Sequence, residues 1–330
     1  MRESDMQGHL YPIFVRTGRR TEQFRAGFID AVGNVVVDPV YECAGAFREG
    51  LGSIQVSKRW GLIDSSGRIV IEPTSGGEAY FSEGRAVFSS GDEARCGVID
   101  RTGRVLVSPT YFRIGNYSEG MAWMSNVGAW KSEPGSYGFL DADGNVRLPF
   151  FFDDARGFRE GVAPVKLGGK WGFIYPSGSF AIPNKFDFAA VFSEGVARVK
   201  VGESWGYIDH KGEYAIEPKF RTAWDFSEGL APAEQNSLWG FINRSGDFEL
   251  PPVYRKVGGF SGGLARVETN DRTGYIDRSG VSRIKQQFRR AGDFQSGLAL
   301  VEKTKELGYI DSEGNFVWQG PYVEVSFAYR

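Results

Sequence analysis

The sequence is poor in the residues that build disulfide networks and metal sites. Its 330 residues include two cysteines, Cys43 and Cys96, and two histidines, His9 and His210. Two cysteines in different contexts do not make a disulfide framework, so we expect a reducing, cytoplasmic compartment. Zinc sites need several Cys or His residues at close spacing, which this chain lacks, and we expect no metal and no cofactor.

Long apolar runs and a charge excess are also missing. No run of about 18 apolar residues occurs, and residues 1–20 lack the apolar core of a signal peptide. The formal net charge of −2 gives no electrostatic reason to bind nucleic acid or an anionic membrane. We therefore expect neither of these as a partner.

Glycine, by contrast, is abundant and regularly spaced. The chain has 45 glycines among 330 residues, where about 7% is usual. One series is 34 residues apart over its last six members: Gly27, Gly61, Gly97, Gly138, Gly172, Gly206, Gly240, Gly274 and Gly308. We call these the anchor glycines. Recurrence at a fixed period indicates a repeat protein.

A second series is formed by four-residue segments of the type FSEG, which we call the xSEG segments. They end at Gly50, Gly84, Gly120, Gly161, Gly195, Gly229, Gly263 and Gly297. Each lies 23 residues after an anchor glycine, whereas the link to the next anchor is 11 residues in six cases and 13 and 18 in the others. A fixed unit with a variable link is typical of surface loops in a repeat array.

Each unit reads as strands joined by a tight turn. "GFIDAVGNVVVDP" and "GLIDSSGRIVIEP" show a β-branched and aromatic run, an Asp-x-x-Gly turn, an alternating apolar run and a Pro that we expect to end the second strand. The "LARV" type run after the xSEG segment is a third strand. The sequence therefore predicts an all-β tandem array of about nine three-stranded antiparallel meanders, either a propeller-like ring or an open β-superhelix. We expect the xSEG aromatics and the Ile two residues after each anchor to form the core.

The same motifs resemble a known family. "KWGFI" at 170–174, "SWGYID" at 204–209 and "LWGFIN" at 238–243, each followed by a glycine turn, look like the WG-repeat family. The resemblance spans about residues 9–320, although Ala26, Cys96, Tyr137, Thr273 and Leu307 replace the Trp. It implies a β-repeat binding module, often bacterial, without a shared enzymatic activity. We expect one array over 1–330, with a leading strand and N-terminal cap at 1–25, repeats at 26–320 and a tail at 321–330.

Repeated carboxylates are the first candidates for chemistry. One set is the turn Asp, as in Asp209, and the other is the Glu of the xSEG segments, as in Glu194. A hydrolase needs one acid and one base in different environments, whereas these residues are the same in almost every unit. We interpret them as turn and backbone hydrogen-bond partners and expect no catalytic residue and no enzyme. A glycan-binding protein or a hydrolase that uses these carboxylates remains an alternative.

Positions that depart from the repeat are the candidates for partner binding. The 18-residue link contains Trp123, Trp130 and Lys131, and exposed aromatics in such a loop suit a protein contact. His210, Lys211 and Glu213 occupy variable positions around a turn, and Arg289 and Arg290 form a basic pair outside the pattern. We expect another protein as the partner. The alternative within this class is an immunity-type inhibitor of a toxin.

Overall fold

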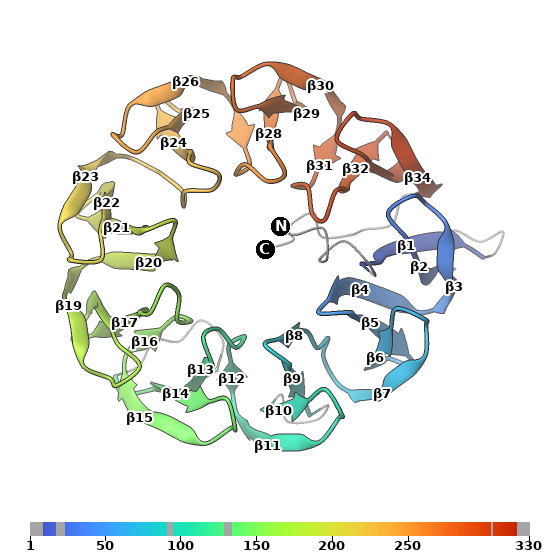
Figure 1. Cartoon of the computed structure of the whole chain (residues 1–330), viewed down its shortest axis with the longest axis horizontal. Coiled ribbons are helices and arrows are strands. Elements are labelled where there is room, and N and C mark those ends of the chain that lie inside the picture. Colours follow the sequence, from blue (N-terminus) through green and yellow to red (C-terminus); the bar gives the residue numbers. More distant parts are fainter. Residues whose placement is uncertain (1–8, 18–23, 91–94, 129–133, 305, 322–330) are drawn as a thin grey trace. The chain divides into compact units, whose positions relative to one another are not determined.

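The computed structural model describes residues 9–17, 24–90, 95–128, 134–304 and 306–321. These residues form strands and turns and no helix, arranged in nine small antiparallel sheets (Figure 1). Each sheet has the up-and-down strand order of a β-propeller blade. The predicted all-β array of nine repeated units is confirmed. By internal contacts the chain divides into two compact units: Met1–Val40, Ser204–Gly206 and Ala215–Arg330 form unit 1, and Tyr41–Glu203 and Tyr207–Tyr214 form unit 2.

Unit 2 contains four complete sheets and part of a fifth. The four are β4(Cys43–Arg48) to β7(Ile69–Ser75) with β5(Leu51–Val56) and β6(Arg59–Asp64); β8(Phe81–Ser82), β9(Arg85–Ser89), β10(Cys96–Asp100) and β11(Val105–Tyr111); β12(Arg113–Ile114), β13(Met121–Ser125), β14(Tyr137–Asp141) and β15(Val146–Phe152); and β16(Asp154–Ala155), β17(Ala163–Leu167), β18(Lys170–Ile174) and β19(Phe180–Phe186). The fifth is β20(Phe188–Ser193), β21(Val196–Val201), β22(Ser204–Ile208) and β23(Tyr214–Phe220), through which the division passes.

Unit 1 contains the first sheet and the last three. They are β1(Tyr11–Arg16), β2(Phe24–Ile29) and β3(Val35–Tyr41); β24(Ala231–Gln235), β25(Leu238–Ile242) and β26(Phe248–Tyr254); β27(Lys256–Val257), β28(Leu264–Thr269), β29(Arg272–Asp277) and β30(Ser282–Phe288); and β31(Arg290–Ala291), β32(Ala299–Lys303), β33(Glu306–Ile310) and β34(Phe316–Pro321).

The sheets do not coincide with the repeats that the sequence suggests. The "LARV" type strand pairs with the Trp-Gly strand that follows it, as β5 pairs with β6 from Leu51↔Asp64 to Val56↔Arg59. Seven sheets have four strands, because a short first strand precedes the xSEG segment or includes part of it. The prediction of three-stranded meanders was therefore wrong in strand number and in sheet boundary. Short first strands, two residues long in β12 and β16, leave too little pattern to be recognised.

The anchor glycines are explained by a bulge in the fourth strand. In the sheet of β18 and β19, Trp171 pairs with Phe186 and Phe173 pairs with Ile182, so Gly172 alone faces three residues. The bulge brings backbone so close that a Cβ on Gly172 would lie 2.6 Å from the Ile182 carbonyl oxygen. All nine anchors have such a carbonyl within 2.8 Å of the Cβ position. The expectation that Pro ends this strand was wrong, because Pro183 lies inside β19, at the bulge.

The Asp-x-x-Gly turns have the predicted form. The carboxylate of Asp100 accepts hydrogen bonds from the N–H groups of Thr102 at 2.9 Å and Arg104 at 3.0 Å. The N–H of Gly103, at φ +83°, donates to the Asp100 carbonyl at 3.0 Å. A positive φ is readily available to glycine and costly for most other residues. The turn therefore depends on two positions that recur from unit to unit, the Asp and the Gly.

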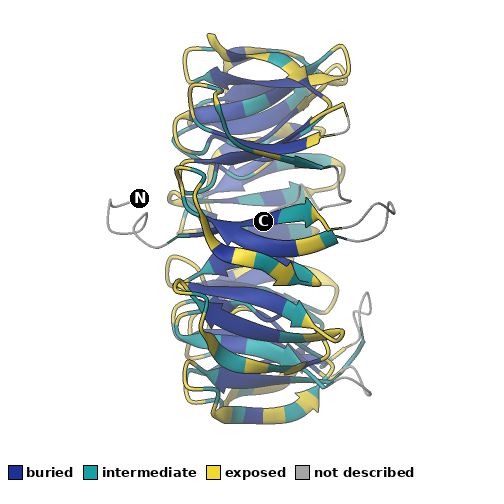
Figure 2. Ribbon diagram, turned by 90° about the vertical axis from the view of Figure 1, so that its right-hand side faces the viewer, coloured by how far each residue is buried: buried dark blue, intermediate teal, exposed yellow. Residues whose placement is uncertain are grey.

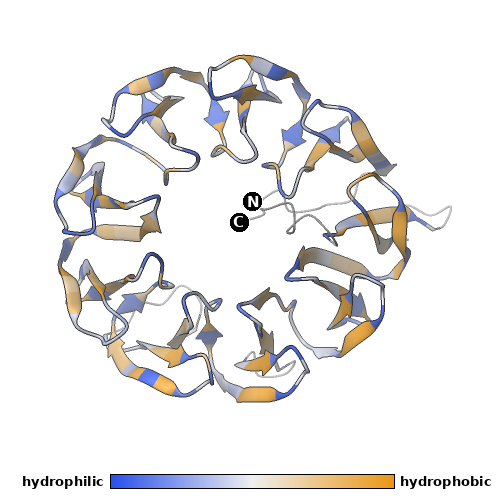
Figure 3. Cartoon of the chain, viewed as in Figure 1, coloured by the Kyte–Doolittle hydropathy of each residue, from blue (hydrophilic) through white to orange (hydrophobic). Residues whose placement is uncertain are grey.

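Both predicted core series are buried. Ile174, Ile208 and Ile242 are fully inaccessible, and all eight xSEG aromatics are at most 4% exposed. Neighbouring sheets share these contacts: the Phe173 ring packs against Phe192 of the next sheet at 5.1 Å between centroids. Figures 2 and 3 show the result, with buried apolar residues along the strands and exposed polar residues at the turns. The hydrophobic contact between consecutive sheets thus holds the array together.

Within unit 1, the first sheet packs against the last. Tyr11 and Ile13 of β1 lie in one buried cluster with Leu307 and Tyr309 of β33. The Tyr309 hydroxyl donates to the Pro12 carbonyl at 3.0 Å, and its ring lies 5.4 Å from that of Tyr11. β1 thus covers a sheet that is nearly 300 residues away in sequence, since Pro12 and Tyr309 are separated by 297 residues.

Candidate functional site

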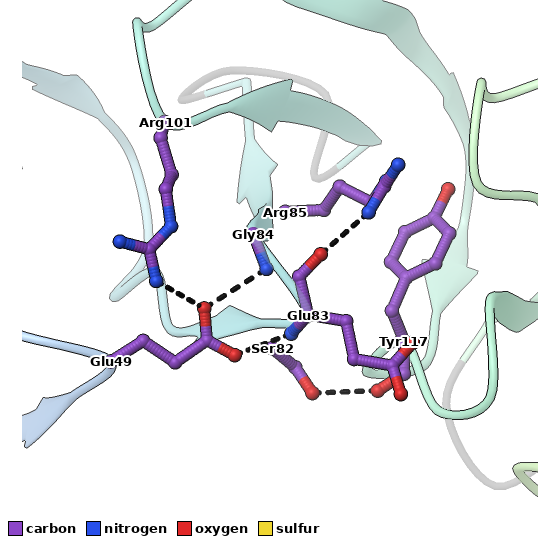
Figure 4. A network of polar contacts seen from close by, with 7 residues as sticks. All are labelled: Glu49, Ser82, Glu83, Gly84, Arg85, Arg101 and Tyr117. Atoms are coloured by element: carbon purple, nitrogen blue, oxygen red, sulfur yellow. Dashed lines mark hydrogen bonds and ion pairs between the residues drawn. The ribbon is translucent and has the colours of Figure 1, made fainter. Parts of the chain in front are cut away.

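The xSEG segments join consecutive sheets through polar contacts that we call the clasps. In Figure 4, the carboxylate of Glu49 accepts hydrogen bonds from the N–H groups of Glu83 at 2.5 Å and Gly84 at 2.9 Å, which belong to the next sheet. Arg101 donates to the same carboxylate at 2.8 Å. The Ser82 hydroxyl donates to the Tyr117 carbonyl of the following sheet at 2.6 Å. The xSEG segments of these three consecutive sheets are thus hydrogen-bonded to one another.

The same clasp recurs in both units. Glu83 accepts from the N–H groups of Glu119 and Gly120 at 2.7 and 2.8 Å. Three further contacts repeat it: Gly161 to Glu119 at 2.9 Å, Gly195 to Glu160 at 3.0 Å and Gly263 to Glu228 at 3.0 Å. The Ser hydroxyls of residues 227 and 261 repeat the Ser82 contact at 2.7 Å each. The interpretation of these carboxylates as backbone hydrogen-bond partners is confirmed.

The backbone of the clasp is unusual for a glutamate. All six xSEG glutamates have φ between 51° and 55°, and the glycines that follow have φ between 74° and 84°. A non-glycine residue costs of the order of 1 kcal/mol or more in this left-handed region. The conformation turns two successive N–H groups toward one carboxylate, and charge-assisted hydrogen bonds of this kind offset the cost.

The electrostatics of Glu49 do not suit an acid catalyst. Its partial burial acts to raise the pKa of the carboxyl. Hydrogen bonds from the Arg101 side chain and from the Gly84 and Glu83 N–H groups outweigh this and hold the pKa below its ordinary value. A general acid in a glycosidase needs the opposite shift. The clasp therefore keeps the carboxylate ionised and engaged with backbone.

His210 contacts a clasp rather than solvent alone. Its ring stacks on Phe192 at 3.9 Å between centroids, and its Nε2 lies 3.1 Å from a Glu160 carboxylate oxygen. Its side chain is 43% exposed. Arg101 occupies the matching position in its own sheet, where it contacts Glu49 and lies over the Phe81 ring. The sequence identified this position as variable, but not that it supports the glutamate of the preceding sheet.

Lys211 and Glu213 flank the same turn and are exposed. Their N–H groups donate to the Asp209 carboxylate at 2.9 and 3.0 Å, so the structure uses their backbone. Both side chains are displayed at the surface beside His210. All three residues are exposed around one turn, and their role in binding a partner stays a prediction.

Arg289 and Arg290 meet a buried acid. Arg289 Nη1 lies 3.0 Å from one oxygen of Glu302, and Arg290 Nε lies 2.5 Å from the other. The Glu302 side chain is fully inaccessible to solvent. Breaking a buried ion pair leaves an uncompensated charge, so this arrangement has a structural role in the last sheet. This ion pair could not be predicted from the sequence, because Glu302 has the spacing of an exposed residue in an alternating strand.

Trp123 lines a pocket of about 540 Å³ in unit 2. The other lining residues are Ile114, Gly115, Asn116, Tyr117, Ser118, Gly157, Phe158, Arg159 and Val191. The Arg113 guanidinium lies 5.0 Å from the centre of the Trp123 ring. Gly115 is required here, because a Cβ at this position would overlap Trp123 Nε1. Trp130 and Lys131, predicted with Trp123 as contact residues, lie outside the described residues.

Tyr117 in this pocket has a hydroxyl group that the residues at the matching position of the other xSEG segments lack. Its hydroxyl is buried and has no hydrogen-bond partner among the described residues. Burial raises its pKa to about 12, so the phenol stays protonated at neutral pH. All seven other xSEG segments have Phe at this position. The hydroxyl therefore adds one polar atom to an otherwise apolar core position.

A group of exposed aromatic residues that the sequence did not single out lies on and directly after the last strands of two neighbouring sheets, β11 and β15. We call Tyr111, Phe112, Phe150 and Phe151 the aromatic patch. Phe151 is 56% exposed, Phe112 37% and Phe150 36%, and the rings of Tyr111 and Phe150 lie 6.0 Å apart across the two sheets. The position of Phe151 in β15 is occupied by Lys185 in β19. The run "LPFFF" was a usable signal, because it breaks the alternation of the strand.

Two kinds of feature, a metal site and a membrane-spanning helix, are absent from the described residues. These residues contain no group of three or more His, Cys, Asp or Glu residues placed to hold a metal ion. None of their elements is a helix long and apolar enough to cross a membrane. Cys43 and Cys96 are both unpaired and half-buried, and burial raises the pKa of each thiol.

Nine repeated antiparallel sheets among the described residues define an all-β repeat protein. The family model described as "WG containing repeat" matches eight segments: residues 27–59, 60–92, 97–128, 137–171, 171–204, 205–239, 239–272 and 274–305. The chain belongs to this family, and the resemblance inferred from the Trp-Gly motifs is confirmed. No curated protein matches it.

Several solved structures are similar at low identity. The "Crystal structure of the eukaryotic initiation factor" has 12% identity and a TM-score of 0.64 over 95% of this chain and 96% of that chain. Dihydro-heme d1 dehydrogenase NirN has 13% identity and a TM-score of 0.49 over 82% and 73%. Apo AztD from Citrobacter koseri has 12% identity and a TM-score of 0.41 over 95% of both chains. The first likeness concerns the fold alone.

Proposed function

We propose that this protein is a non-catalytic repeat module that binds another protein through the aromatic patch. The observation that carries the proposal is the exposure of Phe112, Phe150 and Phe151 together on adjacent sheets. Large aromatic side chains are concentrated in protein interfaces, where they supply much of the binding energy. Exposed aromatic side chains that are close in space mark interaction sites, and Tyr111 and Phe150 are in ring contact across the two sheets.

The long link begins and ends beside this patch. The Phe112 N–H donates to the Ser125 carbonyl at 3.0 Å, and the Ser136 N–H donates to the Phe152 carbonyl at 2.9 Å. Ser125 and Ser136 are the two ends of the segment that holds Trp130 and Lys131. Two residues that border the link, Ser125 and Ser136, thus bond to Phe112 and Phe152, which supports a binding surface in this part of unit 2.

The carboxylates support a non-catalytic role. Each described clasp uses its glutamate to bind backbone N–H groups of the next sheet, as Glu83 does with Glu119 and Gly120. A glutamate that makes the same backbone contact in successive sheets has a structural role in the array. Turnover of any substrate that a single Glu83→Gln substitution abolished would contradict this part of the proposal.

The test is a comparative capture experiment. The protein, the double variant F150S/F151K and the control V253K are used as bait in host lysate, with quantitative mass spectrometry as the readout. Val253 occupies the position of Phe151 in β26 and is 54% exposed, so it reports the effect of a charge on an equivalent strand. We expect one protein to be enriched at least 10-fold by the parent and V253K and to be lost with F150S/F151K.

Two outcomes refine or refute the proposal. Equal capture by all three baits, or no enriched protein, would refute binding through the patch. If the captured protein is an enzyme or toxin whose activity falls on binding, the module is an inhibitor. Unchanged melting temperatures of the two variants would exclude unfolding as the cause, since exposed substitutions of this type alter stability by about 0.5 kcal/mol or less.

A further inference from the structure

One clasp lacks its carboxylate. In the xSEG segment that precedes β28, "FSGG", Gly262 stands where six of the eight segments have glutamate, for example Glu228. Glu228 accepts a hydrogen bond from the N–H of Gly263 at 3.0 Å, so the preceding sheet forms the usual clasp. The next segment, with Ser296 and Gly297, should receive its carboxylate from position 262, where there is no side chain. Among the described residues, neither the Ser296 N–H nor the Gly297 N–H has an acceptor.

The Ser296–Gly297 turn nevertheless has the conformation of the carboxylate-bound turns. Ser296 has φ 48° and Gly297 φ 98°, both in the left-handed region used by the Glu-Gly pairs. The flanking Gln295 and Leu298 exchange backbone hydrogen bonds at 2.8 and 3.1 Å, which closes the turn. On its other side, the Tyr11 hydroxyl donates to the Ser296 carbonyl at 2.5 Å. The two N–H groups are therefore held in the binding geometry by contacts that involve no carboxylate.

Solvent reaches this turn. Gly297 and Gly262 are both exposed, and Ser296 is half-buried. Ser312 stands at the turn position that Arg101 and His210 fill in their sheets, and it too is exposed. Its hydroxyl is a third possible donor at the place where those side chains contact a clasp glutamate. A carboxylate from outside the chain can thus occupy the position that Glu49 takes in Figure 4.

We propose that the N–H groups of Ser296 and Gly297 form a binding site for a carboxylate that another molecule supplies. The chain itself provides the precedent, because five carboxylates bind the equivalent N–H groups at 2.5 to 3.0 Å. Two parallel donors match the two oxygens of a carboxylate. The group comes from a small organic acid or from an acidic side chain of a partner protein. This inference goes beyond the proposed function, because it holds whether or not the aromatic patch binds anything.

The experiment follows the Gly297 amide in protein labelled with ¹⁵N-glycine. Sodium acetate and a tetraglutamate peptide are titrated separately at constant ionic strength, with sodium chloride as the reference salt. We expect a saturable downfield shift of the Gly297 amide proton, with the Gly120 and Gly161 amides unmoved because each already donates to a glutamate. At least 10-fold tighter binding of the peptide assigns the site to a protein partner, and equal affinity per carboxylate assigns it to a small acid.

Gly262→Glu is the matched variant, because it places the missing carboxylate on the chain at a φ of 62°, close to that of the native glutamates. It should weaken binding of both probes at least 10-fold and shift the Gly297 amide proton downfield without a probe. Gly262→Gln controls for the side chain, and Gln287→Glu on β30 controls for the added charge. The proposal is overturned if Gly297 moves no more than Gly120, or if Gly262→Glu binds the probes as tightly as the parent protein.

Discussion

The two edges of each sheet differ in how much their residues vary from one sheet to the next. At the first-strand edge, the xSEG segments repeat one arrangement, in which Glu49, Glu83 and Glu119 bind the next segment in the same way. At the fourth-strand edge, the same strand position holds Phe151 in β15 and Lys185 in β19. Exposed aromatics lie on fourth strands at Phe150, Phe151, Phe180 and Tyr214, although Trp224 and Tyr175 are exposed elsewhere.

This difference distinguishes residues that stabilise the array from residues that are available to bind a partner. A side chain that contacts the next sheet must be repeated, since each sheet needs its neighbour to bury its faces. A side chain at the fourth-strand edge has no such constraint, so each sheet can present a different one. Departures from the repeat, such as Phe150 and Gly262, are therefore where binding should be sought.

Substitution of an anchor glycine should have the largest effect on stability. In Gly206→Val, the new Cβ would lie 2.6 Å from the Ile216 carbonyl oxygen and 2.7 Å from Pro218 N. Backbone atoms cannot move aside without breaking the bulge, so we expect a loss of at least about 3 kcal/mol, or failure to fold. Urea unfolding followed by circular dichroism measures this.

Two further glycines make that result specific. Gly212→Val should also destabilise, because Gly212 has φ +80° and a Cβ there would lie 2.8 Å from Ile182 Cγ2. Gly128 has no atom within 4 Å of its Cβ position and no positive φ, so Gly128→Val should leave the unfolding midpoint nearly unchanged. Equal midpoints for all three variants would contradict the bulge as the reason for the anchor glycines.

Removal of one clasp carboxylate should have an intermediate effect. Glu49→Gln keeps the length of the side chain but removes the charge that Arg101 and two N–H groups bind. We expect a loss of about 1 to 2 kcal/mol, as for other charge-assisted hydrogen bonds. The control is Glu203→Gln, whose side chain is 97% exposed and contacts Lys200 alone. If both variants unfold at the same urea concentration, the clasp contributes nothing to stability.

Much of the fold could be predicted because the repeated units can be compared with one another within one sequence. Burial of Ile174 and of Phe192 followed from their recurrence, and so did the Asp-x-x-Gly turns. The sheet boundaries did not follow, because a repeat has the same period wherever its start is placed. The bulge at Pro183 was missed since Pro is far more common at the end of a strand than within one.

The candidate site was less predictable, because contacts between sheets are invisible in a single unit. His210 was recognised as variable, but its contact with Glu160 spans 50 residues. Arg290 looked like a surface charge, and only the fold places it against the inaccessible Glu302. The aromatic patch combines residues 111–112 with 150–151, which become neighbours only when two sheets stand side by side.

The smallest effect at neutral pH is expected from Asp100→Asn, a substitution in one of the Asp-x-x-Gly turns. A hydrogen bond from the Thr102 side chain, with further ones from the Thr102 and Arg104 N–H groups and the Arg104 side chain, lowers the pKa of Asp100 from 3.8 to about 2. A lowered pKa means that the ionised carboxylate stabilises the fold above pH 4, and that this contribution is lost as the pH falls toward 2. Asn243 already fills the matching turn, where its amide oxygen accepts the N–H groups of Ser245 and Asp247 at 3.0 and 3.2 Å.

Asp100→Asn should therefore fold normally and be slightly less stable than the parent at pH 7. The difference between the two unfolding midpoints should shrink between pH 4 and pH 2, because the parent loses its charge there and the variant has none to lose. Urea midpoints at pH 7, 4, 3 and 2.5 measure this. A constant difference across the series would mean that the Asp100 carboxylate has the same pKa in the folded and unfolded chains, and that its hydrogen bonds to Thr102 and Arg104 do not depend on its charge.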